Sequence, residues 1–362
     1  MAYYLIVERD KMELSLRNFL INITQSFPLF VITILMLGVI LVNGWTDAPN
    51  AIATCISTRS MRPKKAIIVA AIFNFLGVLA MTMISSTVAE TLHGIANFGD
   101  NSSYALIALC AGLVAIVLWA VVAWIFGIPT SESHALIAGI TGAAIAIQKG
   151  IVGINAEEWK KVIVGLILST ILGFVFGYII TKLIEKICKN IDRRRTKRFF
   201  KNLQIFSGGA MAFMHGAQDG QKFIGIFLLA IELSNGIIHT GSVTIPFWIM
   251  ILCSLKMTLG TSIGGYKIIK TVGLKMVKME TYQGASADLA SSISLLTSTI
   301  LGIPVSTTQV KTTAIMGVGA SKRLSNVNWR IVKNMFLAWI ITFPACGLLG
   351  YFTTFLFTKI FV

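Results

Sequence analysis

Apolar stretches separated by short polar segments run along almost the whole chain. Several of these stretches are shorter than the roughly 20 residues that cross a bilayer as a helix, and Gly, Pro or charged residues interrupt others. The pattern predicts an all-α polytopic membrane protein with about 10–12 membrane segments, some of them broken or re-entrant. The ten stretches are residues 28–58, 66–88, 104–126, 134–148, 161–184, 205–232, 244–262, 283–302, 304–320 and 334–358.

Two polar phrases lie inside this apolar sequence, and each returns in the second half of the chain. The first reads NGWTDAPN at residues 43–50 and returns as HGAQDGQK at residues 215–222. The second reads GIPTSESH at residues 127–134 and returns as GIPVSTTQ at residues 302–309. The order is the same and the spacing is nearly the same in both copies. The chain is therefore predicted to be a duplicated membrane protein, which is typical of transporters.

The duplication predicts a simple domain organisation. An N-terminal segment, residues 1–27, precedes a first membrane repeat at residues 28–184. A basic cytoplasmic linker at residues 185–204 leads to a second membrane repeat at residues 205–362. Five crossings in each repeat would make the second copy inverted relative to the first.

The positive charge is distributed unevenly along the chain. Of 31 Lys and Arg residues, 21 fall in segments 59–65, 182–201, 266–280 and 321–333, which alternate with loops that contain none. The positive-inside rule therefore places these four segments in the cytoplasm and both termini outside. A net charge of +16 would suit nucleic acid, but this alternation argues against such a partner. With 55% hydrophobic and 13% charged residues, we expect a multi-pass protein of the plasma or inner membrane, surrounded by the lipid bilayer.

The second phrase of each half is suited to binding an anion. Gly-Ile-Pro ends one helix, and the Ser and Thr residues that follow can cap the next helix, with the Pro expected in its first turn. Inside a bilayer, such a helix start is tolerated where it is buried in protein or lines a cavity. Its free N–H groups, its hydroxyls and the helix dipole all attract anions. Two such starts that face each other would hold a tetrahedral oxyanion between them.

Asp47 and Asp219 indicate a cation beside that anion. A carboxylate in the middle of a bilayer costs about 2.5–3.5 kcal/mol on insertion scales, so it normally faces a cavity, a cation or a proton path. Two carboxylates would repel an oxyanion unless Na⁺ or H⁺ lies between them. A co-transported cation also removes the cost of moving an anion against the membrane potential. A purely structural role as helix caps is the alternative for these residues and for the Ser and Thr residues.

Further polar residues lie near these phrases or in apolar helices. The amides of Asn43, Asn50 and Gln218 could coordinate Na⁺ or donate hydrogen bonds to an anion. Asp288 could bind a cation or bond to a neighbouring helix.

The basic residues of the apolar stretches are open to two interpretations. Lys222 could pair with Asp219 or attract the anion, whereas Lys256 and Lys311 are expected to reach the membrane interface with their long side chains. Two histidines of the repeated phrases could relay protons or make structural hydrogen bonds: His134 and His215.

Together these phrases resemble the signatures of the Pit-type inorganic phosphate transporters, in particular the bacterial low-affinity branch. The first signature, N-G-x-x-D-x-A-N-A, is matched in the first phrase, with Pro49 in place of the usual Ala. The second, H-G-x-N-D-G-Q-K, is matched at residues 215–222, and G-[IL]-P-x-S-[ST]-[ST]-H is met at residues 127–134 and 302–309. The resemblance covers residues 40–358.

The resemblance implies a homodimeric secondary transporter that imports inorganic phosphate by alternating access, in symport with Na⁺ or H⁺ and without another cofactor. Any Na⁺ would lie at Asp47 and Asp219, and no other metal is expected. The phosphate would bind hydroxyls and one amide, and the cation would bind carboxylates and amides. The phosphate ligands would be Thr130, Ser131, Ser133, Ser306, Thr307, Thr308 and Asn50, and the cation ligands Asp47, Asp219, Asn43, Gln218 and Asp288.

Three residues depart from the family's pattern, because Gln218 replaces Asn, Gln309 replaces His and Glu132 replaces Ser or Thr. They leave the coupling ion and the substrate preference open. A symporter of the same fold for sulfate or another oxyanion, or for a neutral metal–phosphate complex, is therefore an alternative. A membrane-embedded phosphatase or phosphotransferase is disfavoured, because it would need a cluster of metal-binding carboxylates or an activated nucleophile. The chain is therefore not expected to be an enzyme.

Overall fold

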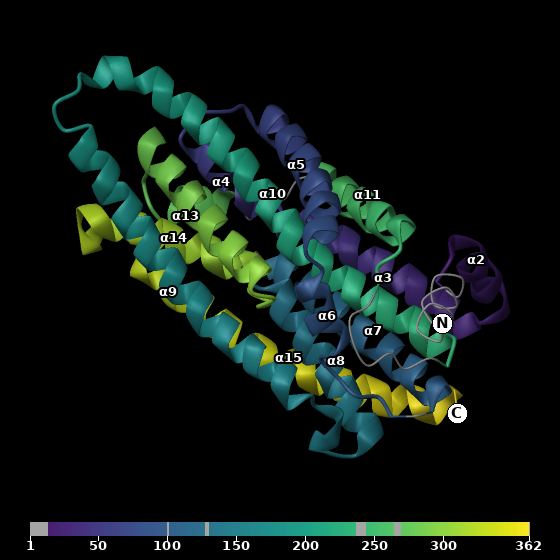
Figure 1. Ribbon diagram of the computed structural model, residues 1–362. Helices are drawn as coiled ribbons and strands as arrows, with labels where there is room; N and C mark the ends of the chain where they lie inside the picture. Colours follow the sequence, from purple (N-terminus) through teal and green to yellow (C-terminus); the bar gives the residue numbers. More distant parts are fainter. Residues whose placement is uncertain (1–13, 100, 127–129, 237–243, 264–268, 362) are drawn as a thin grey trace.

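The protein is built from helices joined by short turns (Figure 1). The computed structural model describes residues 14–99, 101–126, 130–236, 244–263 and 269–361, and this part of the chain contains no β-strand beyond isolated bridges. The predicted all-α fold is thus confirmed. The helices of the first half are α2 (Leu16–Gln25), α3 (Phe27–Thr46), α4 (Pro49–Ser57), α5 (Pro63–Ile84), α6 (Thr87–His93), α7 (Ser102–Phe126), α8 (Glu132–Gln148) and α9 (Ala156–Ile187), with a 3₁₀ turn η1 (Ile151–Gly153). Those of the second half are α10 (Arg193–Ser234), α11 (Phe247–Ile263), α13 (Thr281–Ile300), α14 (Thr307–Lys322) and α15 (Trp329–Phe361), with a π-helical turn η2 (Lys270–Lys275) and a 3₁₀ turn η3 (Leu324–Asn326).

Membrane-spanning helices alternate with helices that are too short to span. Helices α8 and α14 have 17 and 16 residues, which is less than a bilayer crossing needs at a rise of about 1.5 Å per residue. Both short helices were predicted from the sequence. Within the described residues, five segments are long and apolar enough to cross a membrane: Phe27–Ser57, Pro63–Ile84, Ser102–Ala123, Ala156–Ile187 and Trp329–Phe361.

Each half supplies a short helix that packs on the last long helix of the other half. Helix α8 packs against α15, and α14 packs against α9. Small residues make the close approach possible. A Cβ atom at Gly177 of α9 would collide with the carbonyl oxygen of Ala314 in α14, and a Cβ at Gly350 of α15 would collide with that of Gly139 in α8. The two interfaces correspond to each other, as expected for halves related by a pseudo-two-fold axis, and they interlock the two halves.

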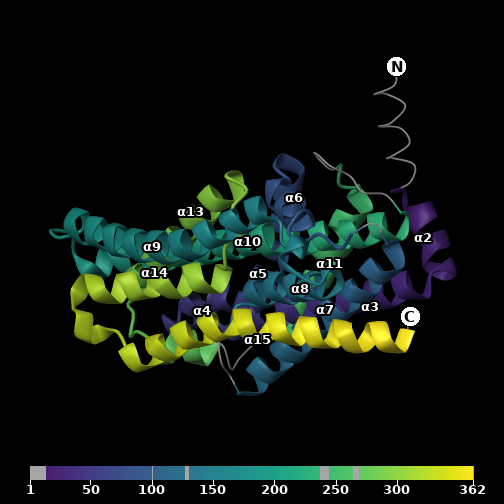
Figure 2. The same ribbon diagram turned by 90° about the horizontal axis from the view of Figure 1, so that it is seen from below.

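Other helix pairs repeat in the same way. The contact of α10 with α5 corresponds to that of α3 with α11, and the contact of α7 with α8 to that of α13 with α14. Helices α9 and α15, which occupy matching places in the two halves, run in opposite directions in both views (Figures 1 and 2). The order of helices and their directions agree with the inverted repeat that the duplicated phrases predict.

The four basic segments meet at one end of the molecule. A cavity of about 980 Å³ at this end is lined by Arg59, by Arg194 and Lys197 of α10, by Glu280, and by Lys322 of α14. Helix α2 and the end of α15 lie at the opposite end (Figure 2). The common location of these segments is what the positive-inside pattern requires.

The basic segment at residues 185–204 is mostly helical. Its first residues form the last turn of α9, and residues 193–204 form the first turns of α10, so only residues 188–192 connect the two helices. Asp192 caps α10 by accepting a hydrogen bond from the backbone N–H of Arg194. The two halves are therefore joined by a tight helical hairpin.

The two Asp-containing phrases differ in backbone structure. Helix α3 ends at Thr46 and α4 begins at Pro49, so Asp47 lies at a break. Pro49 has no N–H group to continue the hydrogen-bond ladder of α3. In the second half the matching residue is Gln221, which has an N–H group, and α10 continues without interruption past Asp219.

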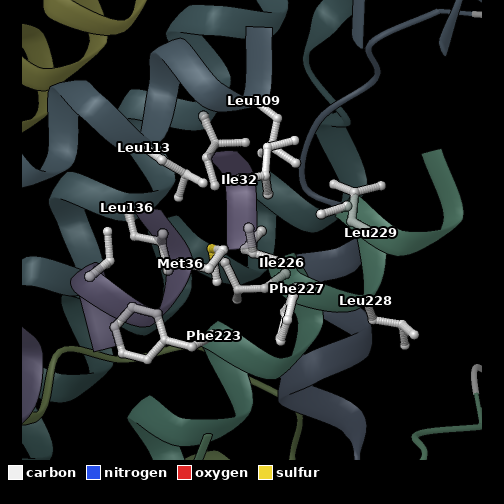
Figure 3. Close-up of a cluster of buried hydrophobic side chains, with 14 of the residues drawn as sticks. Ile32, Met36, Leu109, Leu113, Leu136, Phe223, Ile226, Phe227, Leu228 and Leu229 are labelled. Atoms are coloured by element: carbon white, nitrogen blue, oxygen red, sulfur yellow. The ribbon is translucent and has the colours of Figure 1, made fainter. Parts of the chain in front are cut away.

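A buried apolar cluster fills the space between α3, α7, α8 and α10 (Figure 3). Its side chains point toward one another and include Ile32 of α3, Leu113 of α7, Leu136 of α8 and Ile226 of α10. Each of these four residues is at most 1% exposed. The cluster stabilises the packing of the two halves against each other.

Candidate functional site

Two helix N-termini, one from each half, begin in the protein interior. Ser131 caps α8 by accepting a hydrogen bond from the N–H of His134, and Ser306 caps α14 in the same way from the N–H of Gln309, both at 3.2 Å. Both serines are at most 1% exposed. The predicted caps are confirmed, and both N-termini are buried within the protein.

The Gly-Ile-Pro sequence before α14 ends the preceding helix rather than beginning the next one. Gly302 adopts a left-handed φ of 66°, its N–H bonds to the carbonyl of Thr299, and the N–H of Ile303 bonds to the carbonyl of Ser298. This is a Schellman motif, which commonly has a Pro just after it. Pro304 therefore lies before the cap, and the expectation that it occupies the first turn is wrong. The matching residues 127–129 lie outside the described residues.

Asp219 of α10 is surrounded by donors from both halves. The ammonium of Lys222 lies 2.7 Å from its Oδ1 atom. The hydroxyl of Thr307 donates to Oδ2 at 3.0 Å, and the hydroxyl of Ser133 donates to Oδ1 at 3.3 Å. The amide of Asn43 donates to Oδ2 at 3.4 Å. Since Asp219 is fully buried, this set of donors compensates for the loss of water around its charge.

Lys222 links Asp219 to the starts of both short helices. Besides Asp219, its ammonium donates to the hydroxyl of Ser133 at 2.7 Å and to the carbonyl of Val305 at 2.5 Å. It is 1% exposed. His215, one turn earlier on α10, places Nε2 at 3.3 Å from Oδ2 of Asp219. Asp219 thus has its own cation inside the protein.

Asp47 has a different electrostatic environment. It is 3% exposed, interacts with the hydroxyl of Thr308, and lies close enough to Glu132 and Asp219 to be repelled by them. Its Oδ2 atom has no hydrogen-bond donor among the described residues. Asn50, one residue after Pro49, donates to Thr308 at 2.9 Å.

Glu132 is the first residue of α8 and an acidic neighbour of Asp47. Its Oε1 atom accepts a hydrogen bond from the hydroxyl of Thr46, whereas its Oε2 atom has no donor among the described residues. When the two GIP phrases are aligned, Glu132 corresponds to Thr307. At this matched position, the second half has the neutral hydroxyl of Thr307, which donates to Asp219, whereas the first half has the carboxylate of Glu132 beside Asp47.

We call this group of residues the central site: Asn43, Thr46, Asp47, Asn50, Glu132, Ser133, His215, Asp219, Lys222, Thr307 and Thr308. Three of them are acidic and one is a lysine. Hydroxyls, amides and an ammonium can bind an oxyanion, and unpaired carboxylate and amide oxygens can bind a hard cation. The described residues contain no cluster of His, Cys, Asp and Glu suited to a tightly bound metal ion.

Comparison with known proteins identifies the family. A family model described as the phosphate transporter family matches residues 43–350. The chain belongs to this family. A probable low-affinity inorganic phosphate transporter of Bacillus subtilis (strain 168) is 39% identical over 337 residues, covering 92% of this chain and 99% of that protein. A Rhizobium meliloti (strain 1021) protein described in the same words is 36% identical, over 90% of this chain and 96% of that protein.

The fold of this phosphate transporter family member is also found in a solved structure. A structure described as the sodium-dependent phosphate transporter superposes with a TM-score of 0.84, covering 93% of this chain and 100% of that chain, at 22% sequence identity. Family and fold confirm the expected polytopic transporter. They also agree with the expectation that the protein is not an enzyme.

The structure brings most of the predicted ligands of this family member together. The central site includes four of the predicted acidic and amide ligands and three of the predicted hydroxyls: Asp47, Asp219, Asn43, Asn50, Ser133, Thr307 and Thr308. The hydroxyl oxygens of Ser131 and Ser306 act as caps, and Thr130 is buried beside Ser131. Gln218 donates to the carbonyl of Ile303 at 3.1 Å, and its Oε1 atom has no donor among the described residues.

Asp288 lies apart from the central site. It forms a buried ion pair with Lys311 and accepts hydrogen bonds from Thr54 and Gln204. Lys311 is 0% exposed, so the expectation that it reaches the membrane interface is wrong. Its ammonium is stabilised inside the protein by Asp288 instead.

Gln309 and His134 are directed toward the long helices that close the two halves. Gln309 donates to Thr170 of α9 at 2.6 Å, and the ring of His134 stacks on Phe343 of α15 with centroids 4.7 Å apart. His215 also places Nδ1 at 3.0 Å from the amide oxygen of Asn74. Lys222 pairs with Asp219, which is the first of the two interpretations of that lysine, and its attraction of an anion stays a prediction.

Proposed function

We propose that this protein imports inorganic phosphate by alternating access, in symport with Na⁺ or H⁺ bound between Asp47 and Glu132. Membership of the phosphate transporter family supports phosphate as the substrate. The names of the Bacillus subtilis and Rhizobium meliloti relatives point the same way. The observation that carries the coupling is the unequal charge around the two aspartates.

Asp219 forms an ion pair with Lys222, whereas neither Asp47 nor Glu132 forms an ion pair with a residue that the structure describes, although Lys222 also attracts the carboxylate of Asp47. Two buried carboxylates side by side are unfavourable unless a proton or a metal ion joins them. A phosphate brought into the same site adds further negative charge. Entry of the anion therefore favours entry of the cation, and the reverse holds by linkage.

Unpartnered oxygens support this location for the cation. They are Oδ2 of Asp47 and Oε2 of Glu132, together with the amide oxygens of Asn43 and Asn50. Buried acceptors without donors are rare, because each loses its hydrogen bonds to water. Carboxylate and amide oxygens are the ligands that hard cations take, and either carboxylate could instead carry a proton.

The phosphate would bind between the two short helices. Lys222, Ser133 and Thr307 already converge there on the carboxylate of Asp219, and Asn50 and Thr308 contribute from the other side. The positive ends of α8 and α14 add to this attraction. The hydrogen-bond donors that surround the carboxylate of Asp219 could also donate to the oxygens of a bound phosphate.

Uptake of radiolabelled phosphate into proteoliposomes tests the proposal. We expect uptake to follow an imposed sodium gradient or a pH gradient, and Asp47→Asn and Glu132→Gln to weaken its dependence on that ion. Glu157→Gln is the matched control, because Glu157 is an exposed residue that pairs with Lys160 at the start of α9. Unchanged coupling in both site variants would contradict the proposed cation site. Competition by sulfate, or a requirement for Mg²⁺ or Ca²⁺, would instead favour another oxyanion or a metal–phosphate complex.

We further propose a homodimer, which the family resemblance implies, in the plasma or inner membrane, with both termini outside, as the positive-inside pattern indicates. Helices α9 and α15 have largely unburied apolar faces, which can contact lipid or a second copy. Cross-linking in native membranes would test the dimer. Labelling of single cysteines from either side would test the orientation.

A further inference from the structure

A second polar cluster is buried between the central site and the basic end of the molecule. At its centre is the ion pair of Lys311 on α14 and Asp288 on α13, both 0% exposed. Thr54 of α4 donates to Asp288 at 2.7 Å, and Gln204 of α10 donates to it at 2.5 Å. Lys311 also donates to the hydroxyl of Thr54 at 3.3 Å. Four helices from both halves therefore meet at this pair.

This cluster is continuous with the central site on one side. Lys311 lies one helical turn beyond Thr307 and Thr308, which contact Asp219 and Asn50. Thr54 lies one turn beyond Asn50 on α4, about 6 Å further along the axis. An anion that leaves the central site along these helices would meet Lys311 next.

The cluster is continuous with the basic cavity on the other side. Thr58, the residue that directly follows the last turn of α4, lines the cavity. A Cβ atom at Gly284 would meet both Gln204 and Thr58, so these two side chains are neighbours. Asn50, Thr54 and Thr58 thus form a polar stripe, with one helical turn between successive members, that leads from the central site to a cavity rich in Arg and Lys.

The matching route in the other direction is apolar. Alignment of the two Asp-containing phrases makes Thr54 correspond to Ile226 and Gln204 to Ile32. Alignment of the two GIP phrases makes Asp288 correspond to Leu113 and Lys311 to Leu136. The four apolar counterparts form part of the buried cluster of Figure 3. The pseudo-two-fold axis therefore places an ion pair on one side of the central site and a buried apolar cluster on the other.

We propose that the Asp288–Lys311 ion pair is the gate on the route from the central site to the basic end, and that the apolar cluster is the seal on the opposite route. The inference rests on the proposed function. As phosphate approaches, it attracts the ammonium of Lys311, while Gln204 and Thr54 continue to donate to Asp288. The apolar cluster has no charged residue that could turn from its partner to the anion. The route on that side therefore opens only when the helices separate.

Cys55 is a built-in reporter of this gate. Its sulfur lies 3.9 Å from Oδ2 of Asp288 and 3.3 Å from the carbonyl oxygen of Gln204, and the residue is buried. In a chain whose four other cysteines are replaced by alanine, we expect a hydrophilic thiol reagent to label Cys55 from the basic end. Phosphate together with the coupling ion should accelerate this labelling at least tenfold. Labelling that does not depend on phosphate and the coupling ion would overturn the proposal.

The double variant Asp288→Leu with Lys311→Leu introduces the residue type found at the matching positions of the first half, Leu113 and Leu136. We expect this double variant to bind radiolabelled phosphate in detergent as the parent does, but to lose at least tenfold in uptake and in Cys55 labelling. The exchange Asp288→Lys with Lys311→Asp keeps an ion pair at this position. It should restore part of the phosphate uptake and part of the Cys55 labelling. Full phosphate uptake by the double leucine variant would refute the gate. The gate would also be refuted if the exchanged pair took up phosphate no faster than the single variants Asp288→Leu and Lys311→Leu. Absence of phosphate binding by the parent protein would instead refute the proposed function.

Discussion

Replacing Lys222 with Met removes the lysine that pairs with Asp219, and its effect tests how the central site is held together. The ammonium lies 2.7 Å from Asp219 and also donates to Ser133 and to the carbonyl of Val305. Both charged residues are at most 1% exposed. Removal of one partner of such a pair costs about 3–5 kcal/mol, because the other charge stays buried without compensation.

Asp219→Asn should cost a similar amount, since it leaves the ammonium of Lys222 without its carboxylate. The double variant removes both charges and should be far less destabilised than the sum of the single variants. We therefore expect a coupling energy of about 3 kcal/mol in a double-mutant cycle. The free energy of unfolding can be measured by chemical denaturation in mixed micelles, with tryptophan fluorescence as the signal.

Lys256→Met provides the matched control. Lys256 lies on the apolar helix α11, is half-buried, and forms no ion pair with a residue that the structure describes. Its replacement should change the free energy of unfolding by less than about 1 kcal/mol. A coupling energy below about 0.5 kcal/mol between Lys222 and Asp219, the range of independent sites, would refute the ion pair as a stabilising element.

Three further predictions concern other parts of the structure. Glu132→Gln should raise the cation concentration for half-maximal phosphate uptake at least about tenfold. One charge 4–8 Å from a cation is worth about 2–4 kcal/mol at an effective dielectric constant of 20. An unchanged half-maximal concentration would exclude Glu132 as a cation ligand. Ser306→Ala removes the cap of α14 and should lower stability by about 1 kcal/mol, whereas Ser306→Asn should restore most of it in the same thermal unfolding assay. Gly177→Leu should prevent α9 from packing on α14, and a yield of folded monodisperse protein equal to that of the parent in gel filtration would contradict that close contact.

Much of the central site could be predicted because its residues stand out against apolar sequence and occur twice. Asp47 and Asp219 occupy the same place in their two phrases, and Ser131 and Ser306 cap helices as their positions suggested. The ion pair of Asp288 and Lys311 could not be predicted in this way. The two residues are on different helices, and only the packing of α13 and α14 against α4 and α10 brings them together.

Local backbone chemistry explains the remaining differences from the predicted fold. Pro49 interrupts the first half at Asp47, whereas Gln221 allows α10 to continue past Asp219. For the segment between the halves, the sequence indicates only a hydrophilic cytoplasmic linker and does not predict its helices. It is helical because Asp192 caps α10, and because charged residues are stable on a helix that extends beyond the membrane.

The exchange of short helices between the halves has a consequence for the assembly of the protein in the cell. When α8 and α9 leave the ribosome, each lacks the packing partner that the second half supplies, because α15 and α14 are synthesised last. The acidic start of α8 must therefore be shielded by lipid headgroups, water or the insertion machinery until translation ends. Truncated chains that lack α15 should be recognised by membrane quality control, even though they contain a complete first repeat.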